Sequence, residues 1–189
     1  MWKSGFIYSS IQYVHSISMK RDQVETVNKL PFDKRVFLTL DLECDYGTAL
    51  DKNTYDAATS TNELASLLES FEVPLSCFLQ TELLTARPDA VDNLLAADVP
   101  VEMHAHSHTH PDHDEANVAF EVTESVERVR DEFGTSPVGF RFPDGAIDGT
   151  DYQILAANGV SFSSSVFPSL RPGRFNNLDQ PRVPFRHPP

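Results

Sequence analysis

The sequence has few lysines, few cysteines and no long apolar run. Only five of its 189 residues are lysine, and Asp plus Glu number 28 against 15 Lys plus Arg, giving a formal net charge of −13. A surface this acidic repels nucleic acid and anionic membranes, so neither is an expected partner. Such a composition also keeps proteins hydrated in concentrated salt, which leaves a halophilic source and an ordinary acidic protein as alternatives.

The two cysteines, Cys44 and Cys77, allow at most one disulfide. Each lies in or beside an apolar run, which predicts buried reduced thiols, with a single disulfide between them as the alternative.

The N-terminal region has neither the apolar core nor the cleavage site of a signal peptide. Its apolar residues are interrupted by Ser9, Ser10 and His15, and no stretch reaches the length of a membrane span. The sequence therefore predicts a cytoplasmic protein. We expect residues 1–34 to form a poorly organised leader, or to include an over-extended gene start with Met19 as the true one.

From residue 36 onward, strand patterns alternate with helix patterns. A capping box begins the first helix, and Gly134 and Gly159 follow later helices. This alternation predicts one domain with an α/β fold and a parallel sheet, open or closed into a barrel. We expect strands at 36–40, 73–79, 99–103, 137–141 and 160–162, and helices at 60–71, 88–97, 115–133 and 150–158.

Five of the seven histidines lie within residues 104–113. Because 99–103 predicts a short strand, we expect the histidines on the loop at its C-terminal end, where α/β folds gather their chemistry. His106 and His110 are four residues apart, which suits two metal ligands on one turn of chain. This cluster predicts a divalent metal site, with a polar loop of nonspecific metal affinity as the alternative.

Two other strand ends carry charged residues. Asp41 and Glu43 are two apart, so a continuing strand points both the same way, and one can hold a metal while the other acts as a base. Arg141 can grip a carboxylate with two hydrogen bonds, and after Pro143 the N–H of Asp144 can point at a ligand. Taken singly, these segments are also compatible with a solvated acidic loop and a surface turn.

In order along the chain, these segments resemble the motifs of the polysaccharide deacetylase family, or NodB-homology domain. Residues 39–43 resemble its Thr-Phe-Asp-Asp motif, 106–110 its His-Ser/Thr-x-x-His motif, and 141–145 its Arg-x-Pro-x-Gly motif. Residues 159–168 are similar to a Gly-x-x-Tyr-Asp-Ser-Ser-x-x-Pro stretch of some members. The resemblance covers about residues 35–187.

The resemblance implies that residues 35–189 form a distorted (β/α) barrel with deacetylase activity. A hydrolase of this family acts on carbon–nitrogen bonds other than peptide bonds and removes N-acetyl groups from a carbohydrate. Metal-activated water attacks the amide carbonyl, with Asp41 as the base, Arg141 orienting it and the N–H of Asp144 stabilising the oxyanion.

The resemblance also implies a divalent metal, expected to be zinc, held by Glu43, His106 and His110. In most members the acidic ligand directly follows the base, where this chain has Leu42. Branches with an Asp-x-Asp/Glu pattern make Glu43 the ligand.

Two departures from the family leave other functions open. No late Leu-x-x-His motif, the family's source of the acid, occurs before Pro189, and Ser163 stands where the family has Asp. We therefore expect a barrel that lacks its late strands. The alternatives are a metal-binding domain without turnover and a hydrolase of another linear amide. A metallohydrolase that uses His104 and His106 as a His-x-His pair ranks lowest, because few histidines follow.

Overall fold

The computed structural model describes residues 12–13, 25–26, 37–45, 54–109, 117–167, 178 and 185–186. Its helices are α1 (Thr61–Ser70), α2 (Leu83–Ala86), α3 (Pro88–Leu95), α4 (Val118–Phe133) and α5 (Asp151–Ala157), with 3-10 turns η2 (Ala57–Ser60) and η3 (Pro143–Gly145). In this part of the chain, no helix has the length and apolar character needed to cross a membrane.

Five consecutive parallel strands form one side of the sheet, and each pairs with the next along the chain. This order confirms the predicted α/β fold class, since parallel neighbours require a crossover between them. The five are β3 (Thr39–Leu42), β4 (Leu75–Gln80), β5 (Val101–Ser107), β6 (Gly139–Phe140) and β7 (Phe162–Ser163).

Short strands continue the sheet beyond β7. They are β1 (Gln12–Tyr13), antiparallel to β7, then β8 (Phe185–Arg186), parallel to β1, and β2 (Glu25–Thr26), antiparallel to β8. The strand order runs from β2 at one end to β3 at the other. Of the expected leader 1–34, only β1 and β2 fall within the described residues.

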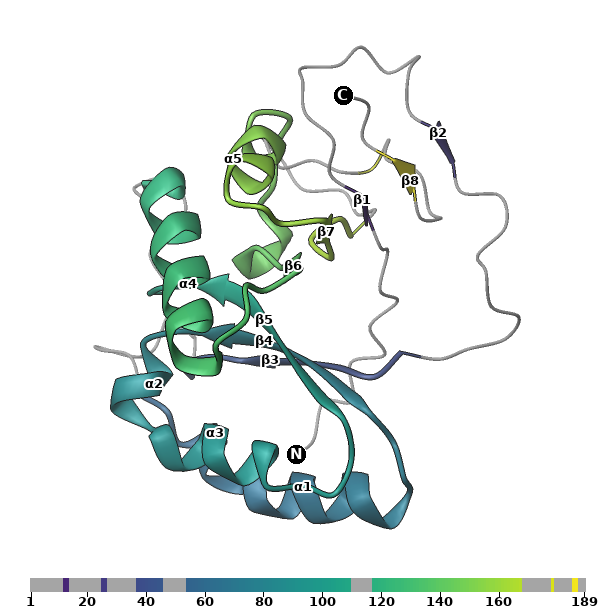
Figure 1. Cartoon of the computed structure of the whole chain (residues 1–189), viewed down its shortest axis with the longest axis vertical. Coiled ribbons are helices and arrows are strands. Elements are labelled where there is room, and N and C mark those ends of the chain that lie inside the picture. The colour runs from purple at the N-terminus through teal and green to yellow at the C-terminus, as the bar shows by residue number, and fades with distance from the viewer. Residues whose placement is uncertain are drawn as a thin grey trace.

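The helices divide the core into two clusters. Helices α1, α2 and α3 lie together on one flank of β3, β4 and β5 (Figure 1), where Leu68, Leu79 and Leu94 are buried. Val126 of α4 and Leu155 of α5 belong to a second cluster beside β5 and β6. Burial of these apolar faces is the main source of the stability of the fold. Because the strands are parallel, their carboxyl ends lie at one edge of the sheet.

The third expected strand is longer than predicted, and this corrects the placement of the histidines. β5 runs to Ser107, so His104 and His106 lie in the strand and not on the loop after it. Pairing with β4 keeps this polar stretch extended. The register shifts between Leu79, which pairs with Ala105, and Gln80, which pairs with Ser107, so His106 has no paired residue on β4. Such irregularities re-aim side chains beside functional sites.

The helix termini agree only partly with the sequence patterns. Gly134 and Gly159 adopt the expected left-handed conformation, with φ of 71° and 75°. The predicted capping box is wrong, because Ser60 makes no side-chain cap bond where η2 runs directly into α1. Cys44 and Cys77 are buried free thiols, as predicted.

Candidate functional site

The buried guanidinium of Arg141 joins β3 to the end of β6. Nη1 donates to Asp41 Oδ1 at 2.6 Å, and Nη2 donates to Thr39 Oγ1 at 3.2 Å. Nε donates to the carbonyl of Ser164 at 3.1 Å, Nη2 to its hydroxyl at 2.7 Å, and the group lies 4.1 Å from the ring centre of Phe78. Arg141 is 1% exposed, so these contacts hold a charge out of water beside a single orientation of the Asp41 carboxylate.

Two serines, one in β7 and one after it, complete the support of this edge. Ser165 Oγ accepts from the Phe142 N–H at 2.8 Å, and Ser163 Oγ lies 2.7 Å from Ser165 Oγ. The sequence resemblance included these serines but gave them no role. The one sequence feature that could have indicated a role is their position, because they directly follow the predicted strand 160–162 at the sheet edge expected for Arg141.

Glu43 and His106 meet at the carboxyl ends of β3 and β5. Glu43 Oε2 lies 3.0 Å from His106 Nε2, with the imidazole almost fully buried and the carboxylate partly exposed. Ligand atoms bind zinc at about 2.0–2.2 Å, so two atoms this close can reach one ion, and carboxylate with imidazole is a donor set that zinc accepts. The two described members of the predicted ligand set therefore fit a cation.

The third predicted ligand, His110, lies outside the described residues. Within the described ranges, no group of three or more His, Cys, Asp or Glu side chains is arranged to hold a metal ion. Of the three predicted ligands, the structure therefore describes Glu43 and His106.

A buried amide fixes the backbone beside Glu43. Gln80 Oε1 accepts from the Cys44 N–H at 2.7 Å, while Gln80 Nε2 donates to Glu82 Oε2 at 3.3 Å. Tyr55 donates to the same Glu82 oxygen at 2.7 Å. Burial, followed by the Glu43 charge, raises the pKa of the Cys44 thiol to about 11. The sequence pattern did not reveal this network, because Gln80 follows the predicted strand 73–79 and belongs to none of the motifs.

The described histidines have different surroundings despite their even spacing. His104 is buried between the rings of Phe78 and Phe162, at centroid distances of 5.1 and 5.2 Å. Its ring nitrogens have no hydrogen-bond partner among the described residues. Burial, and then the Arg141 charge, lower the pKa of His104 to about 4, so it is neutral at pH 7. His108 Nδ1 instead lies 3.0 Å from Thr81 Oγ1.

Asp144 lies in the turn η3, directly after the Arg141 segment. Its φ is 56°, and Gly145 follows with a φ of 63°. Glycine adopts this conformation freely, so the strain lies at Asp144, and such strain is found at functional sites. The assignment of the Asp144 N–H to an oxyanion stays a prediction.

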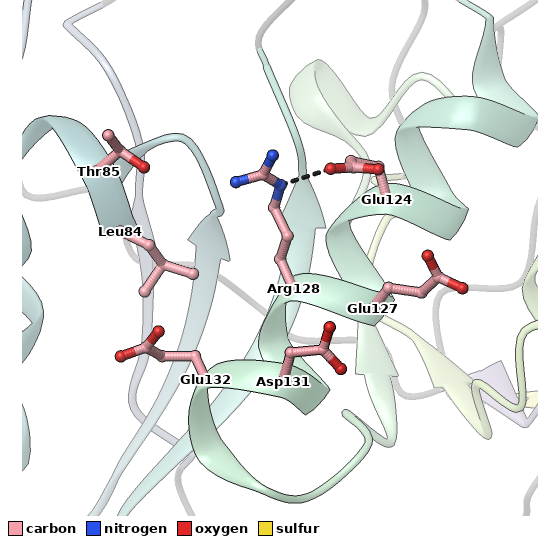
Figure 2. A pocket seen from close by; sticks show the side chains of 7 residues that line it. All are labelled: Leu84, Thr85, Glu124, Glu127, Arg128, Asp131 and Glu132. Carbon is pink, nitrogen blue, oxygen red and sulfur yellow. Dashed lines mark hydrogen bonds and ion pairs between the residues drawn. The ribbon is translucent and has the colours of Figure 1, made fainter.

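A groove of about 430 Å³ lies between α2 and α4 and contains none of the predicted site residues. Its lining includes Leu84 and Thr85 of α2 and four carboxylates of α4, and Arg128 Nε donates to Glu124 Oε1 at 2.6 Å (Figure 2). The candidate chemistry is therefore at the sheet edge and not in this groove.

Among solved structures, similarity is found to carbohydrate esterases. A family 4 carbohydrate esterase from Bacillus anthracis is 18% identical, with a TM-score of 0.52 over 67% of this chain and 56% of that one. The chain thus spans little more than half the length of that esterase. The deacetylase PplD of Streptococcus pyogenes is 16% identical, with a TM-score of 0.55 over 82% of this chain and 73% of that one.

A further similar structure is a family 4 pseudoenzyme from Bacillus anthracis, 14% identical, with a TM-score of 0.50 over 67% of this chain and 42% of that one. These likenesses support the predicted barrel type of fold. No curated protein sequence matches the chain.

The family model described as polysaccharide deacetylase matches residues 32–163, which include all three predicted motifs. This match covers most of the chain, from β3, which carries Asp41, to β7. The chain belongs to the polysaccharide deacetylase family.

Proposed function

We propose that this chain is a metal-dependent N-deacetylase that removes acetyl groups from an N-acetylated carbohydrate. The observation that carries the proposal is the meeting of Glu43 with His106, at 3.0 Å, on the same sheet edge as the Asp41–Arg141 pair. One pair supplies ligands and the other a fixed carboxylate, which is the division of labour that metal-assisted amide hydrolysis requires.

The proposed cation is zinc, held by Glu43, His106 and His110. When bound, it supplies an acidified water and a Lewis acid for the amide carbonyl. Glu43 and His106 present a carboxylate oxygen and an imidazole nitrogen, and the resemblance of residues 106–110 to the family's histidine motif supports His110 as the third ligand.

Asp41 is the proposed base. Its carboxylate is 24% exposed, so it can reach a substrate in the site while Arg141 holds Oδ1 from the buried side. A fixed carboxylate accepts a proton from the attacking water without reorienting in the transition state. The N–H of Asp144 is the proposed donor to the oxyanion.

A second candidate is a metal-binding domain that does not turn over substrate. Of the seven histidines, the described part of the chain contains only His104, His106 and His108. His104 is neutral and buried, His106 is a proposed ligand, and His108 is bonded to Thr81. The neutral ring of His104 is unsuited to protonating a leaving amine, and this observation favours the second candidate.

Zinc content and acetate release test the proposal together. The purified protein is loaded with zinc, freed of excess metal and incubated with N-acetylglucosamine oligomers, before and after chelation. We expect about one zinc per chain and acetate release that chelation abolishes. Glu43→Gln, which keeps the side-chain size but not its charge, should lose both.

Bound zinc without acetate release would favour the second candidate. Release from a simple N-acetylated amide but not from the oligomers would identify a non-sugar substrate. A chain that binds no zinc would refute the metal-dependent mechanism.

A further inference from the structure

A carboxylate from helix α4 holds the backbone of the segment that leads into His110. Glu121 Oε2 accepts from the N–H groups of His108 and Thr109, each at 2.9 Å. Glu121 Oε1 accepts from the hydroxyl of Thr109, also at 2.9 Å. One side chain thus receives three donors from two consecutive residues, an arrangement that fixes their orientation relative to α4.

The same segment is anchored from its other side by backbone groups. The carbonyl of Ser107 accepts from the Thr81 N–H at 2.9 Å, and the carbonyl of His108 accepts from the Glu82 N–H at 3.0 Å. Because these bonds use only carbonyl groups, the N–H groups of His108 and Thr109 need another acceptor, which Glu121 provides.

The position of Glu121 on α4 suits a side chain that accepts hydrogen bonds from backbone N–H groups. Asn117 caps this helix by accepting from the Phe120 N–H at 3.1 Å, and Glu121 lies in the first turn. The helix N-terminus and the two N–H donors both stabilise a negative charge there. The carboxylate is therefore committed to the backbone it holds and is not a spare metal ligand.

We propose that Glu121 is a positioning residue for the metal site: it fixes the backbone of His108 and Thr109, the two residues that precede the proposed ligand His110 in the sequence. The inference rests on the proposed function, because it assumes His110 as a ligand. It adds a residue from outside the three motifs.

The test compares three substitutions of Glu121 with a control on the same helix. Glu121→Ala removes the acceptor. Glu121→Asp keeps the charge but withdraws it by one methylene. Glu121→Gln keeps one oxygen for the two N–H groups and offers its amide N–H to Thr109 Oγ1. Glu127→Ala is the matched control, because that glutamate is exposed on α4.

Two measurements are made on each protein: hydrogen exchange of the His108 and Thr109 amides without zinc, and the zinc Kd. We expect Glu121→Ala and Glu121→Asp to speed exchange of both amides about tenfold or more. Loss of a group that orients a ligand typically weakens metal binding by roughly 10–100-fold, and we expect that loss here. Glu121→Gln should restore most of both properties, and Glu127→Ala should change neither.

The outcomes separate this proposal from the proposed function. Should Glu121→Ala fail to fold, Glu121→Asp decides, and wild-type zinc affinity in Glu121→Asp would overturn the proposal. Fast exchange of both amides in the wild-type protein would also overturn it. If the wild-type protein binds no zinc, the proposed metal site fails and the positioning role with it, whereas the exchange data still establish whether Glu121 holds the segment.

Discussion

Asp41 and Arg141 are 100 residues apart in the chain, yet Nη1 of the arginine lies 2.6 Å from Oδ1 of the carboxylate. The contact joins β3 to the segment after β6 across the intervening strands. Because Arg141 is buried and also bonded to Ser164, it cannot turn away from Asp41 without losing several hydrogen bonds at once. The proposed base is therefore held from the interior of the fold.

Asp41→Asn should keep zinc and lose activity. The amide oxygen can still accept from Arg141, so the fold should persist, but the side chain can no longer take a proton. General-base removal typically costs about 10²–10⁴-fold in rate. The measurement is zinc content beside acetate release at saturating substrate. Loss of zinc in this variant would make Asp41 a ligand and not the base.

The histidines of the second motif should contribute unequally to metal binding. We expect His106→Ala and His110→Ala each to weaken zinc binding by more than about 100-fold, beyond the usual cost of losing an orienting neighbour. His108→Ala should bind zinc nearly as well as wild type, because His108 bonds to Thr81. Titration with a zinc-competing chelator gives the three constants, and equal losses in all three variants would contradict the ligand assignment.

Gly139→Ala should destabilise the fold through the ring of Phe162. A Cβ added at Gly139 would lie 2.4 Å from Phe162 Cζ, closer than carbon atoms approach. Overpacking of this kind costs about 1–3 kcal/mol of unfolding free energy. Urea denaturation measures the cost, and in a double-mutant cycle Phe162→Leu should relieve most of it.

Gly149→Ala is the matched control for this experiment, because nothing lies within 4 Å of a Cβ added there. A cost at Gly149 equal to that at Gly139 would argue against the steric explanation.

Cys77 should be unreactive in the folded protein and should make stability fall at high pH. Burial, with the Asp41 charge, raises the pKa of this thiol above its ordinary value near 9. The unfolded chain releases the proton near pH 9 and the folded chain does not, so the stabilisation is complete below pH 9 and lost as the pH rises further. Urea denaturation between pH 8 and 10 should therefore show a shallower decline for Cys77→Ala than for wild type. Rapid labelling of Cys77 by a thiol reagent at pH 8 would contradict its burial.

Much of the fold could be predicted because its patterns are local. The spacing of Val122, Val126 and Val129 on α4 is a helical period that buries one face, and Gly134 stops that helix by its left-handed φ. The extent of β5 could not be predicted in this way. Its histidines are polar, and only pairing with β4 keeps them extended.

The site residues that belong to a motif could be predicted from the sequence, whereas isolated side chains that support the site could not. Asp41 and Arg141 belong to recognisable segments, and so do Glu43 and His106. Gln80 directly follows the predicted strand 73–79 without belonging to a motif, and Glu121 is one of several acidic positions in the predicted helix 115–133. Their roles depend on backbone groups contributed by distant segments, for which local sequence carries no pattern.

The alternation of strands and helices, the order of three charged segments at strand ends and the family can all be recognised in the amino-acid sequence. Those properties follow from side-chain periodicity and residue type, which are written into short stretches of chain. Three other features depend on how the strands pack: Arg141 reaches Asp41, Glu43 meets His106, and His104, two residues from His106, is a buried neutral ring. Hydrogen bonds and burial are set by which strands lie side by side, so these outcomes exist only once the sheet has formed.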